Sequence, residues 1–269
     1  MRSPSDSSRV ESRRGDVVVQ TAALTKVFGG LTAVDRLDFQ VHRGEIAALI
    51  GPNGAGKTTV FNVVTGIYRP EAGSVLFQGR DITGWKAHRI VREGVARTFQ
   101  NIRLFPNLTC LENVMAGMHC RTSAGVAAAL LRTPKLLREE REIRAAAESR
   151  LAQVGLAGSA DELARNIPYG RQRMLEVARA LASGPHLLVL DEPSSGLNPR
   201  ETEDLMSFIK AVIRDEHLTV LLIEHDMRVV MGISDWVTVM DGGRKIAEGP
   251  PARIYHDPVV IEAYLGGRK

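Results

Sequence analysis

The chain is poor in cysteine, in aromatic residues and in long apolar runs. Its 269 residues include two cysteines, Cys110 and Cys120, so nothing indicates a disulfide framework or an oxidising compartment. His119 lies beside Cys120, but no C-x-x-C and no second ligand pair is nearby, so we expect no metal site there. No apolar run approaches the roughly 18 residues that span a bilayer. We therefore expect the protein to be soluble, or to reach a membrane only through a partner.

The chain also lacks a concentrated basic surface, although its formal net charge is +4. Residues 1–14 hold four arginines against two acidic residues, and Arg268 with Lys269 adds two more positive charges, which leaves a neutral body. A neutral body with 5% aromatic residues offers no basic stripe or stacking platform, so no nucleic acid partner is expected. Residues 1–15 are polar and have no apolar core, which is typical of a disordered tail and not of a signal peptide.

Apolar stretches separated by turns indicate strands in the first third of the chain. Residues 37–41 alternate Leu37, Phe39 and Val41 with polar residues, as a half-buried strand does. We expect strands near residues 17–20, 37–41, 46–50 and 74–78.

The middle of the chain has a helical pattern. Thr109-Cys-Leu-Glu112 has the spacing of a capping box and predicts a helix through Met118. Residues 124–154 are rich in Ala, Leu, Arg and Glu, and Glu140 precedes Arg144 by four positions, which favours a helix with a solvated face.

After this centre, strands and helices alternate again. Residues 186–190 and 218–223 are continuous apolar runs, as expected of parallel strands covered on both faces. Residues 199–215 are predicted to form the helix between them.

A glycine-rich turn follows the strand predicted at residues 46–50. It matches G-x-x-x-x-G-K-[ST], in which glycines let backbone N–H groups surround phosphates. The helix that begins near Gly56 adds its positive end, about half an elementary charge. We expect Lys57 to reach the β and γ phosphates and Thr58 to offer its hydroxyl to Mg²⁺. A turn without a ligand is the alternative. The predicted triphosphate site comprises Gly51, Pro52, Asn53, Gly54, Ala55, Gly56, Lys57, Thr58 and Thr59.

Polar residues follow both later strands. Asp191, at a strand tip expected beside the glycine-rich turn, can hold Mg²⁺ through its water shell, and Glu192 can polarise or deprotonate the water that attacks the γ phosphate. His225 should emerge at the same sheet edge, where it can contact the γ phosphate and orient that water. An ordinary acidic strand end and a structural histidine are the alternatives.

These residues resemble the ATP-binding subunits of ABC transporters over nearly all of residues 16–269. The Walker A motif is 51–59, Walker B is 187–192, and His225 matches the switch histidine. Gln100 matches the Q-loop, which implies a catalytic role and a place near the metal.

The resemblance implies further residues and a fold. Phe28 lies where the family stacks an aromatic ring on adenine. The fold implied is an α/β P-loop NTPase with a mostly parallel core sheet, an N-terminal antiparallel β-subdomain and an inserted α-helical subdomain. Residues 16–98 and 185–269 would form the core, and 99–184 the Q-loop and helical subdomain.

The family signature, normally L-S-G-G-Q, departs from the pattern in this chain. Tyr169, Gly170 and Arg171 occupy its tip, where the family caps the ATP of the opposite subunit. Pro168 replaces a serine and has neither a hydroxyl nor an N–H. Our hypothesis is that the site completed by this signature is weakened; harmless drift is the alternative. Asn198 stands where many D-loops carry Asp.

The resemblance also implies partners. A chain with one Walker A and one signature needs a second ATPase subunit. The region after Gln100 and the end of the chain look like the larger ATPase subunit of branched-chain amino acid importers. This implies two transmembrane permeases and an extracytoplasmic binding protein, with the chain at the cytoplasmic face of the membrane. Leu104, Phe105 and Leu108 would receive a permease helix or simply pack in the core.

Three other functions stay open on the sequence. An ATPase of urea or amide import, or of lipopolysaccharide export, would keep the chemistry and change the cargo. A soluble ABC protein acting on nucleic acid or ribosomes and a non-hydrolysing regulatory subunit are less favoured, because the body is neutral and both Glu192 and His225 are present.

Overall fold

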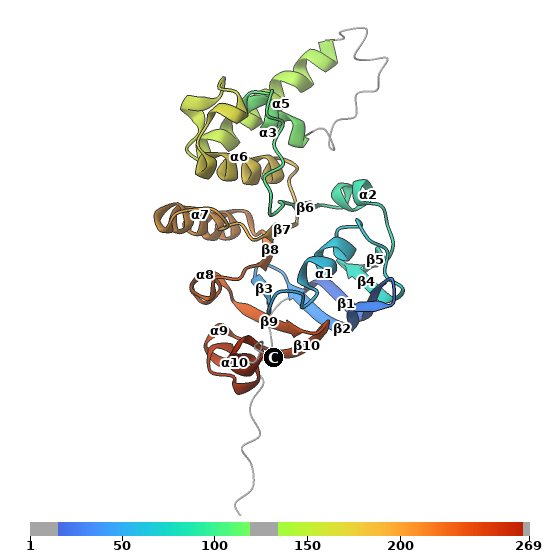
Figure 1. The fold of residues 1–269 in the computed structure, drawn as a ribbon. Helices are drawn as coiled ribbons and strands as arrows, with labels where there is room; N and C mark the ends of the chain where they lie inside the picture. The colour runs from blue at the N-terminus through green and yellow to red at the C-terminus, as the bar shows by residue number, and fades with distance from the viewer. Residues whose placement is uncertain (1–15, 119–133, 266–269) are drawn as a thin grey trace, which may run out of the picture.

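The computed structural model describes residues 16–118 and 134–265. Its core is a six-stranded sheet in the order β10-β9-β3-β8-β7-β6 (Figure 1). All neighbours pair in parallel except β10, which runs antiparallel to β9 at the edge. The strands of this sheet are β3 (Ile46–Ile50), β6 (Val95–Arg97), β7 (Leu187–Asp191), β8 (Thr219–Ile223), β9 (Trp236–Asp241) and β10 (Arg244–Gly249).

A second, antiparallel sheet has the order β2-β1-β4-β5. Its β1 runs to residue 28 and not to residue 20 as predicted, because a register irregularity near Ala23, which has φ +46°, interrupts the alternation that marks a strand. The half-buried pattern of residues 37–41 is confirmed. The strands are β1 (Val17–Phe28), β2 (Leu31–His42), β4 (Ala72–Phe77) and β5 (Arg80–Asp81).

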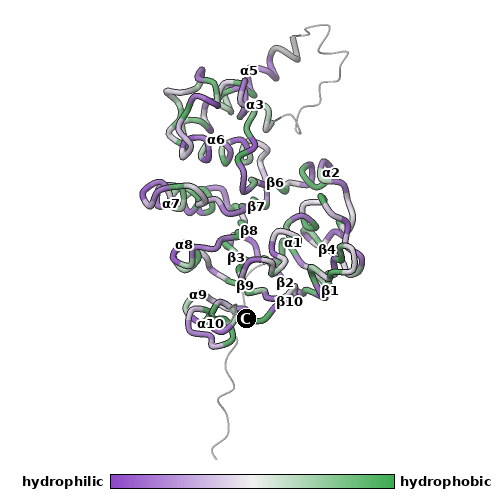
Figure 2. The backbone as a smooth tube through the Cα atoms, viewed as in Figure 1, coloured by the Kyte–Doolittle hydropathy of each residue, from purple (hydrophilic) through white to green (hydrophobic). Residues whose placement is uncertain are grey.

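Alternate residues of the core strands point into two separate apolar layers. On one face, Val189 and Leu221 pack with α1 (Lys57–Val64) and with the antiparallel sheet. On the other face, Leu190 and Leu222 pack against helices that alternate hydrophobic and hydrophilic residues (Figure 2). The continuous apolar runs predicted for β7 and β8 are therefore buried on both sides. The helices of that face are α6 (Tyr169–Ala182), α7 (Pro199–Glu216) and α8 (Met227–Ile233).

A helical layer lies at one end of the molecule, built from α3 (Cys110–Met118), α5 (Pro134–Gln153) and α6 (Figure 1). The predicted capping box of α3 is confirmed by reciprocal bonds between Thr109 and Glu112. The helix predicted over 124–154 is described only from residue 134. Within it, Arg144 pairs with Glu148, one turn ahead, and not with Glu140.

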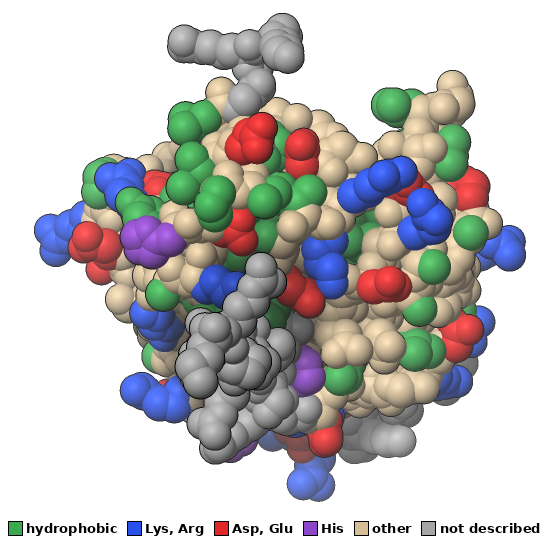
Figure 3. All heavy atoms as spheres, turned by 90° about the horizontal axis from the view of Figure 1, so that it is seen from below, with side chains coloured by type: hydrophobic (Ala, Val, Ile, Leu, Met, Phe, Trp, Pro, Cys, Tyr) green, Lys and Arg blue, Asp and Glu red, His purple; other side chains and the backbone are tan. Residues whose placement is uncertain are grey.

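The remaining helices are short, and none is apolar enough over its length to cross a membrane in the part of the chain that the structure describes. On the face seen from below, basic and acidic side chains are interspersed (Figure 3).

The two sheets confirm the predicted α/β fold class, with its mostly parallel core and its antiparallel subdomain. The predicted tail, His119 and Cys120 lie outside the described residues. The remaining helices are α2 (Ala87–Arg92), α9 (Pro251–Tyr255), α10 (Pro258–Leu265) and the 3₁₀ turns Ala157–Ser159 and Ala164–Asn166.

Candidate nucleotide-binding and hydrolysis site

The glycine-rich turn runs from the tip of β3 to the start of α1 and has no room for larger residues at its two ends. A Cβ on Gly51 would lie 2.0 Å from the carbonyl oxygen of Met240, and one on Gly56 would lie 2.3 Å from that of Ala33. Gly56, at φ +97°, is the N-cap of α1 and provides no side-chain cap. The N–H groups of the first turn are therefore not bonded to a capping side chain, which suits them to an anion.

Lys57 is buried at the start of α1 and reaches back over the turn. Its Nζ donates to the carbonyl oxygens of Gly51, at 2.7 Å, and Pro52, at 2.9 Å. Burial lowers the pKa of Lys57, and the carboxylates of Glu192 and Asp191 act in the opposite direction. An ammonium in this position is already largely desolvated, so it can attract a phosphate strongly.

Three polar side chains converge at the carboxyl ends of β7 and β8. Gln100 Nε2 donates to Glu192 Oε2 at 2.9 Å, and His225 Nδ1 lies 3.7 Å from the same oxygen. Glu192 itself adopts φ +46°, a region that is costly for a residue with a side chain and that is found at functional sites. The structure thus brings together the residues predicted to act on water.

The sequence did not indicate which strands are neighbours in the sheet. The strand that carries Asp191 is not beside β3, because β8 lies between them. All three strands are parallel, so Asp191, His225 and the glycine-rich turn still share one edge of the sheet.

The residues predicted to hold a magnesium ion are oxygen donors of the kind that ion prefers. Thr58 is exposed at the second position of α1, and the carboxylate of Asp191 lies at the tip of β7. Within the described residues, no three His, Cys, Asp or Glu side chains form a cluster that could hold a metal. These residues fit a Mg²⁺ ion for which water and substrate phosphates supply most of the ligands.

The signature residues lie at the start of α6, exposed or half-buried. Tyr169 donates its hydroxyl to the carbonyl of Ser195, and among the described interactions no hydrogen bond or ion pair joins Gly170 or Arg171 to the glycine-rich turn. Phe28 lies at the end of β1, edge-on to Tyr68 at 5.2 Å between ring centres.

Two further residues support the site: Glu224, and Asn198, which the sequence marked only as a departure from the D-loop pattern. Glu224 is fully buried; its Oε1 accepts from Ser194 N at 2.9 Å and its Oε2 from His225 N at 3.1 Å. It thereby joins the loops that follow β7 and β8. Asn198 caps α7 in a reciprocal bond with Glu201. An acidic residue that directly follows an apolar strand was the available clue to Glu224.

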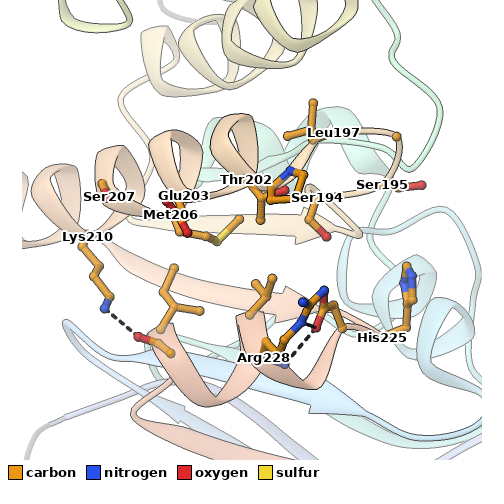
Figure 4. A pocket seen from close by; sticks show the side chains of 16 residues that line it. Ser194, Ser195, Leu197, Thr202, Glu203, Met206, Ser207, Lys210, His225 and Arg228 are labelled. Atoms are coloured by element: carbon orange, nitrogen blue, oxygen red, sulfur yellow. Dashed lines mark hydrogen bonds and ion pairs between the residues drawn. The ribbon is translucent and has the colours of Figure 1, made fainter.

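A groove of about 560 Å³ lies between α7 and α8, next to this site (Figure 4). Ser195 and His225 stand at one end of it and Lys210 at the other. Lys210 donates to the carbonyl of Gly232 at 2.6 Å, and Arg228 pairs with Asp226 at 2.9 Å. The first of these bonds joins α7 to α8, and the second lies at the start of α8.

Comparison with known proteins agrees with this geometry. Residues 34–195 match the ABC transporter family model, and residues 244–269 match that of the branched-chain amino acid ATP-binding cassette transporter. The ATP-binding cassette MJ1267 of an ABC transporter, in its ADP conformation, superposes with a TM-score of 0.81 at 30% identity, covering 93% of this chain and 99% of that one. The chain belongs to the ABC transporter ATP-binding family, whose members bind and hydrolyse ATP.

More closely related sequences narrow the family further. The chain is 46% identical over 250 residues to the high-affinity branched-chain amino acid transport ATP-binding protein BraF of Pseudomonas aeruginosa, which covers 93% of this chain and 98% of BraF. It is 45% identical over 239 residues to LivG of Escherichia coli K12, a protein of the same description, covering 89% and 94%. Within the ABC family, the chain belongs with these transport ATPases.

Proposed function

We propose that this chain is the ATP-hydrolysing subunit that powers import of branched-chain or other hydrophobic amino acids. The observation that carries the enzymatic part is the position of Glu192 Oε2, 2.9 Å from Gln100 Nε2 and 3.7 Å from His225 Nδ1, on the sheet edge that also bears Lys57. The cargo rests on the relatives that the chain resembles and on the match at its C-terminal end.

In this function the residues divide the work by position. The glycine-rich turn and Lys57 hold the β and γ phosphates, and Phe28 offers a flat ring to adenine. Glu192 accepts a proton from the attacking water, while Gln100 and His225 hold that water in line with the γ phosphate. Thr58, Asp191 and Gln100 would hold Mg²⁺, which supplies charge neutralisation on the phosphates.

The exposed signature residues support a second ATPase subunit as a partner. Tyr169 and Arg171 are exposed, and no described hydrogen bond joins the signature residues to the chain's own phosphate turn, which supports a second ATPase subunit whose ATP they would cover. Binding of that ATP between two subunits would keep bulk water away from the site and retain the attacking water.

A surface suited to a permease lies near the Q-loop. An open groove of about 660 Å³ is lined by residues that include Leu104 and Phe105, and Phe105 is 51% exposed. We propose that a cytoplasmic helix of one permease docks there, with the chain at the cytoplasmic face of the membrane. An extracytoplasmic binding protein would deliver the amino acid to the permeases.

The enzymatic proposal is tested with Glu192→Gln in the assembled transporter. We expect ATP affinity to remain and hydrolysis to fall by about 10²-fold or more, because the proton acceptor is lost. Glu248→Gln is the matched control, since Glu248 is a partly exposed surface residue paired with Lys245. Rapid turnover by Glu192→Gln would contradict the role of Glu192.

The cargo is tested separately. Permeases that copurify with the chain, followed by ligand screening of the associated binding protein, should identify branched-chain amino acids. Binding of urea or amides alone, or the absence of any binding protein, would reject the amino acid assignment and leave the ATPase function standing.

A further inference from the structure

The signature tyrosine makes two hydrogen bonds within its own subunit. Tyr169 stands where most of the family carries glycine, and its side chain is 44% exposed. Its hydroxyl accepts from Arg173 Nη2 at 3.2 Å and donates to the carbonyl oxygen of Ser195 at 3.3 Å. One hydroxyl thus bridges helix α6 and the loop that follows β7. We name this pair of bonds the Tyr169 bridge.

On the Arg173 side, the bridge extends to the Q-loop. Arg173 is fully buried and donates to the carbonyl oxygens of Phe99 and Gln100, both at 2.8 Å. Glu176, also buried, balances its charge at 3.0 Å. Gln100 in turn donates its side-chain amide to Glu192. Every link in this path is a direct hydrogen bond, and a buried guanidinium leaves little freedom to change partners.

On the Ser195 side, the bridge reaches the backbone of the same glutamate. Ser195 N donates to the carbonyl oxygen of Glu192 at 3.1 Å. The tyrosine ring packs against the next residue, because a Cβ on Gly196 would lie 2.9 Å from Tyr169 Cε1. Gly196 has φ +79°, a conformation that glycine adopts easily, and its lack of a side chain leaves room for the ring.

We infer that Tyr169 is a positioning residue for Glu192. Its hydroxyl holds the Q-loop carbonyls, through Arg173, and the loop 194–197 in one relative arrangement. The side chain and the backbone of Glu192 are therefore both tied to the first turn of α6. A glycine at position 169 would leave these two supports independent. The consequence for hydrolysis rests on the proposed role of Glu192, whereas the bridge itself does not.

The test removes one oxygen atom. Tyr169→Phe keeps the ring against Gly196 and deletes both hydrogen bonds, and Tyr255→Phe makes the same change at an exposed tyrosine of α9. In the full chain without nucleotide, hydrogen exchange should rise together by about fivefold in residues 98–103, where the N–H groups of Thr98 and Arg103 are hydrogen-bonded, and in residues 194–197. This is the factor that corresponds to a hydrogen bond of about 1 kcal/mol. Tyr255→Phe should leave both segments unchanged.

In the assembled transporter, Tyr169→Phe should lower kcat for ATP by a similar factor of about five and change KM for ATP by less than twofold, since the ring itself is kept. Unchanged exchange in either segment would overturn the inference, and so would a rise in KM at constant kcat. Equal thermal unfolding of the variant and the wild type shows that the fold is intact. If Glu192→Gln hydrolyses ATP normally, the proposed function fails while the exchange result still decides the bridge.

Discussion

Arg97 and Asp191 form a buried ion pair beneath the hydrolysis site, with Nη2 and Oδ2 2.7 Å apart. Their side chains are 7% and 5% exposed. The other guanidinium amine of Arg97 donates to Asn62, at 2.8 Å, and to Thr65, at 2.9 Å, both at the end of the phosphate-binding helix or just beyond it. Arg97 therefore fixes the Walker B carboxylate relative to α1.

Removing this guanidinium should destabilise the protein strongly. In Arg97→Met, the carboxylate of Asp191 stays buried without its partner, and we expect a loss of about 3–5 kcal/mol in the free energy of unfolding. Urea denaturation of the full chain measures it. The control is Arg138→Gln, which breaks an exposed pair with Glu142 and should cost about 0.3–0.5 kcal/mol. A loss below about 1 kcal/mol in Arg97→Met would show that the pair contributes no support.

Close packing between α3 and α6 depends on Gly117. A Cβ at this position would lie 2.2 Å from the carbonyl oxygen of Arg179. We expect Gly117→Ala to cost about 1–3 kcal/mol by overpacking, although alanine favours helices by about 1 kcal/mol over glycine. Gly158→Ala is the control, because a Cβ there meets nothing within 4 Å. Equal unfolding midpoints in urea for the two variants would contradict this packing argument.

Cys110 gives the protein a predictable response to alkaline pH. Burial, and secondarily the charge of Glu162, raises the pKa of the Cys110 thiol above its ordinary value of 9.0. The folded protein therefore holds this proton more tightly than the unfolded chain does. Its contribution to stability is full below pH 9 and falls by about 1.4 kcal/mol per pH unit above it, until the folded-state pKa is reached.

The measurement uses a Cys120→Ser background, so that one thiol titrates. Urea unfolding between pH 8 and 10.5 should show the falling stability, and Cys110→Ala in the same background should remove that part of the slope. The thiol should also resist Ellman's reagent until the protein unfolds, since Cys110 is fully buried. Identical pH slopes with and without the thiol would disprove the assignment.

The variant Pro168→Ser tests whether the unusual signature weakens an ATP site. It is the N-cap of α6 and provides no side-chain bond to the first turn. We expect Pro168→Ser in the assembled transporter to raise the ATPase rate by about twofold to fivefold, because a serine hydroxyl adds a hydrogen bond to phosphate or backbone of about 1 kcal/mol. An unchanged rate would remove the idea of a weakened site.

The control for Pro168→Ser is Pro250→Ser, since Pro250 is also an uncapped helix N-cap, at α9. In both variants the gain of a cap is offset by about 0.4–1 kcal/mol from the added freedom of the unfolded chain. Stability should therefore change little in either, and the ATPase rate should rise only in Pro168→Ser.

The parts of the site that depend on local pattern could be predicted from the sequence. The turn around Lys57, the acidic end of β7 and the capping box at Thr109 each require particular residues at fixed spacing, and all lie where predicted. Residue spacing also indicated that Asp191 and His225 share a sheet edge, because both follow buried parallel strands.

The parts that depend on long-range contacts could not be predicted. Nothing in the sequence indicated that Arg97 and Arg173 are buried. Their burial follows from the packing of strands and helices that are distant in the chain. The position of β8 between β3 and β7 is a matter of topology, which local pattern does not encode. Arg144 had acidic residues on both sides at helical spacing, and sequence alone did not favour Glu148 over Glu140.

Glu224 limits how this cassette could be recombined with others. Because one carboxylate receives the N–H of Ser194 and the N–H of His225, the two catalytic loops share a single anchor. A chimera that imports only the loop after β8, from a cassette with another residue at position 224, would leave the Ser194 N–H of the retained loop without its acceptor. Such grafts should succeed only when both loops and their common acid are exchanged as one block.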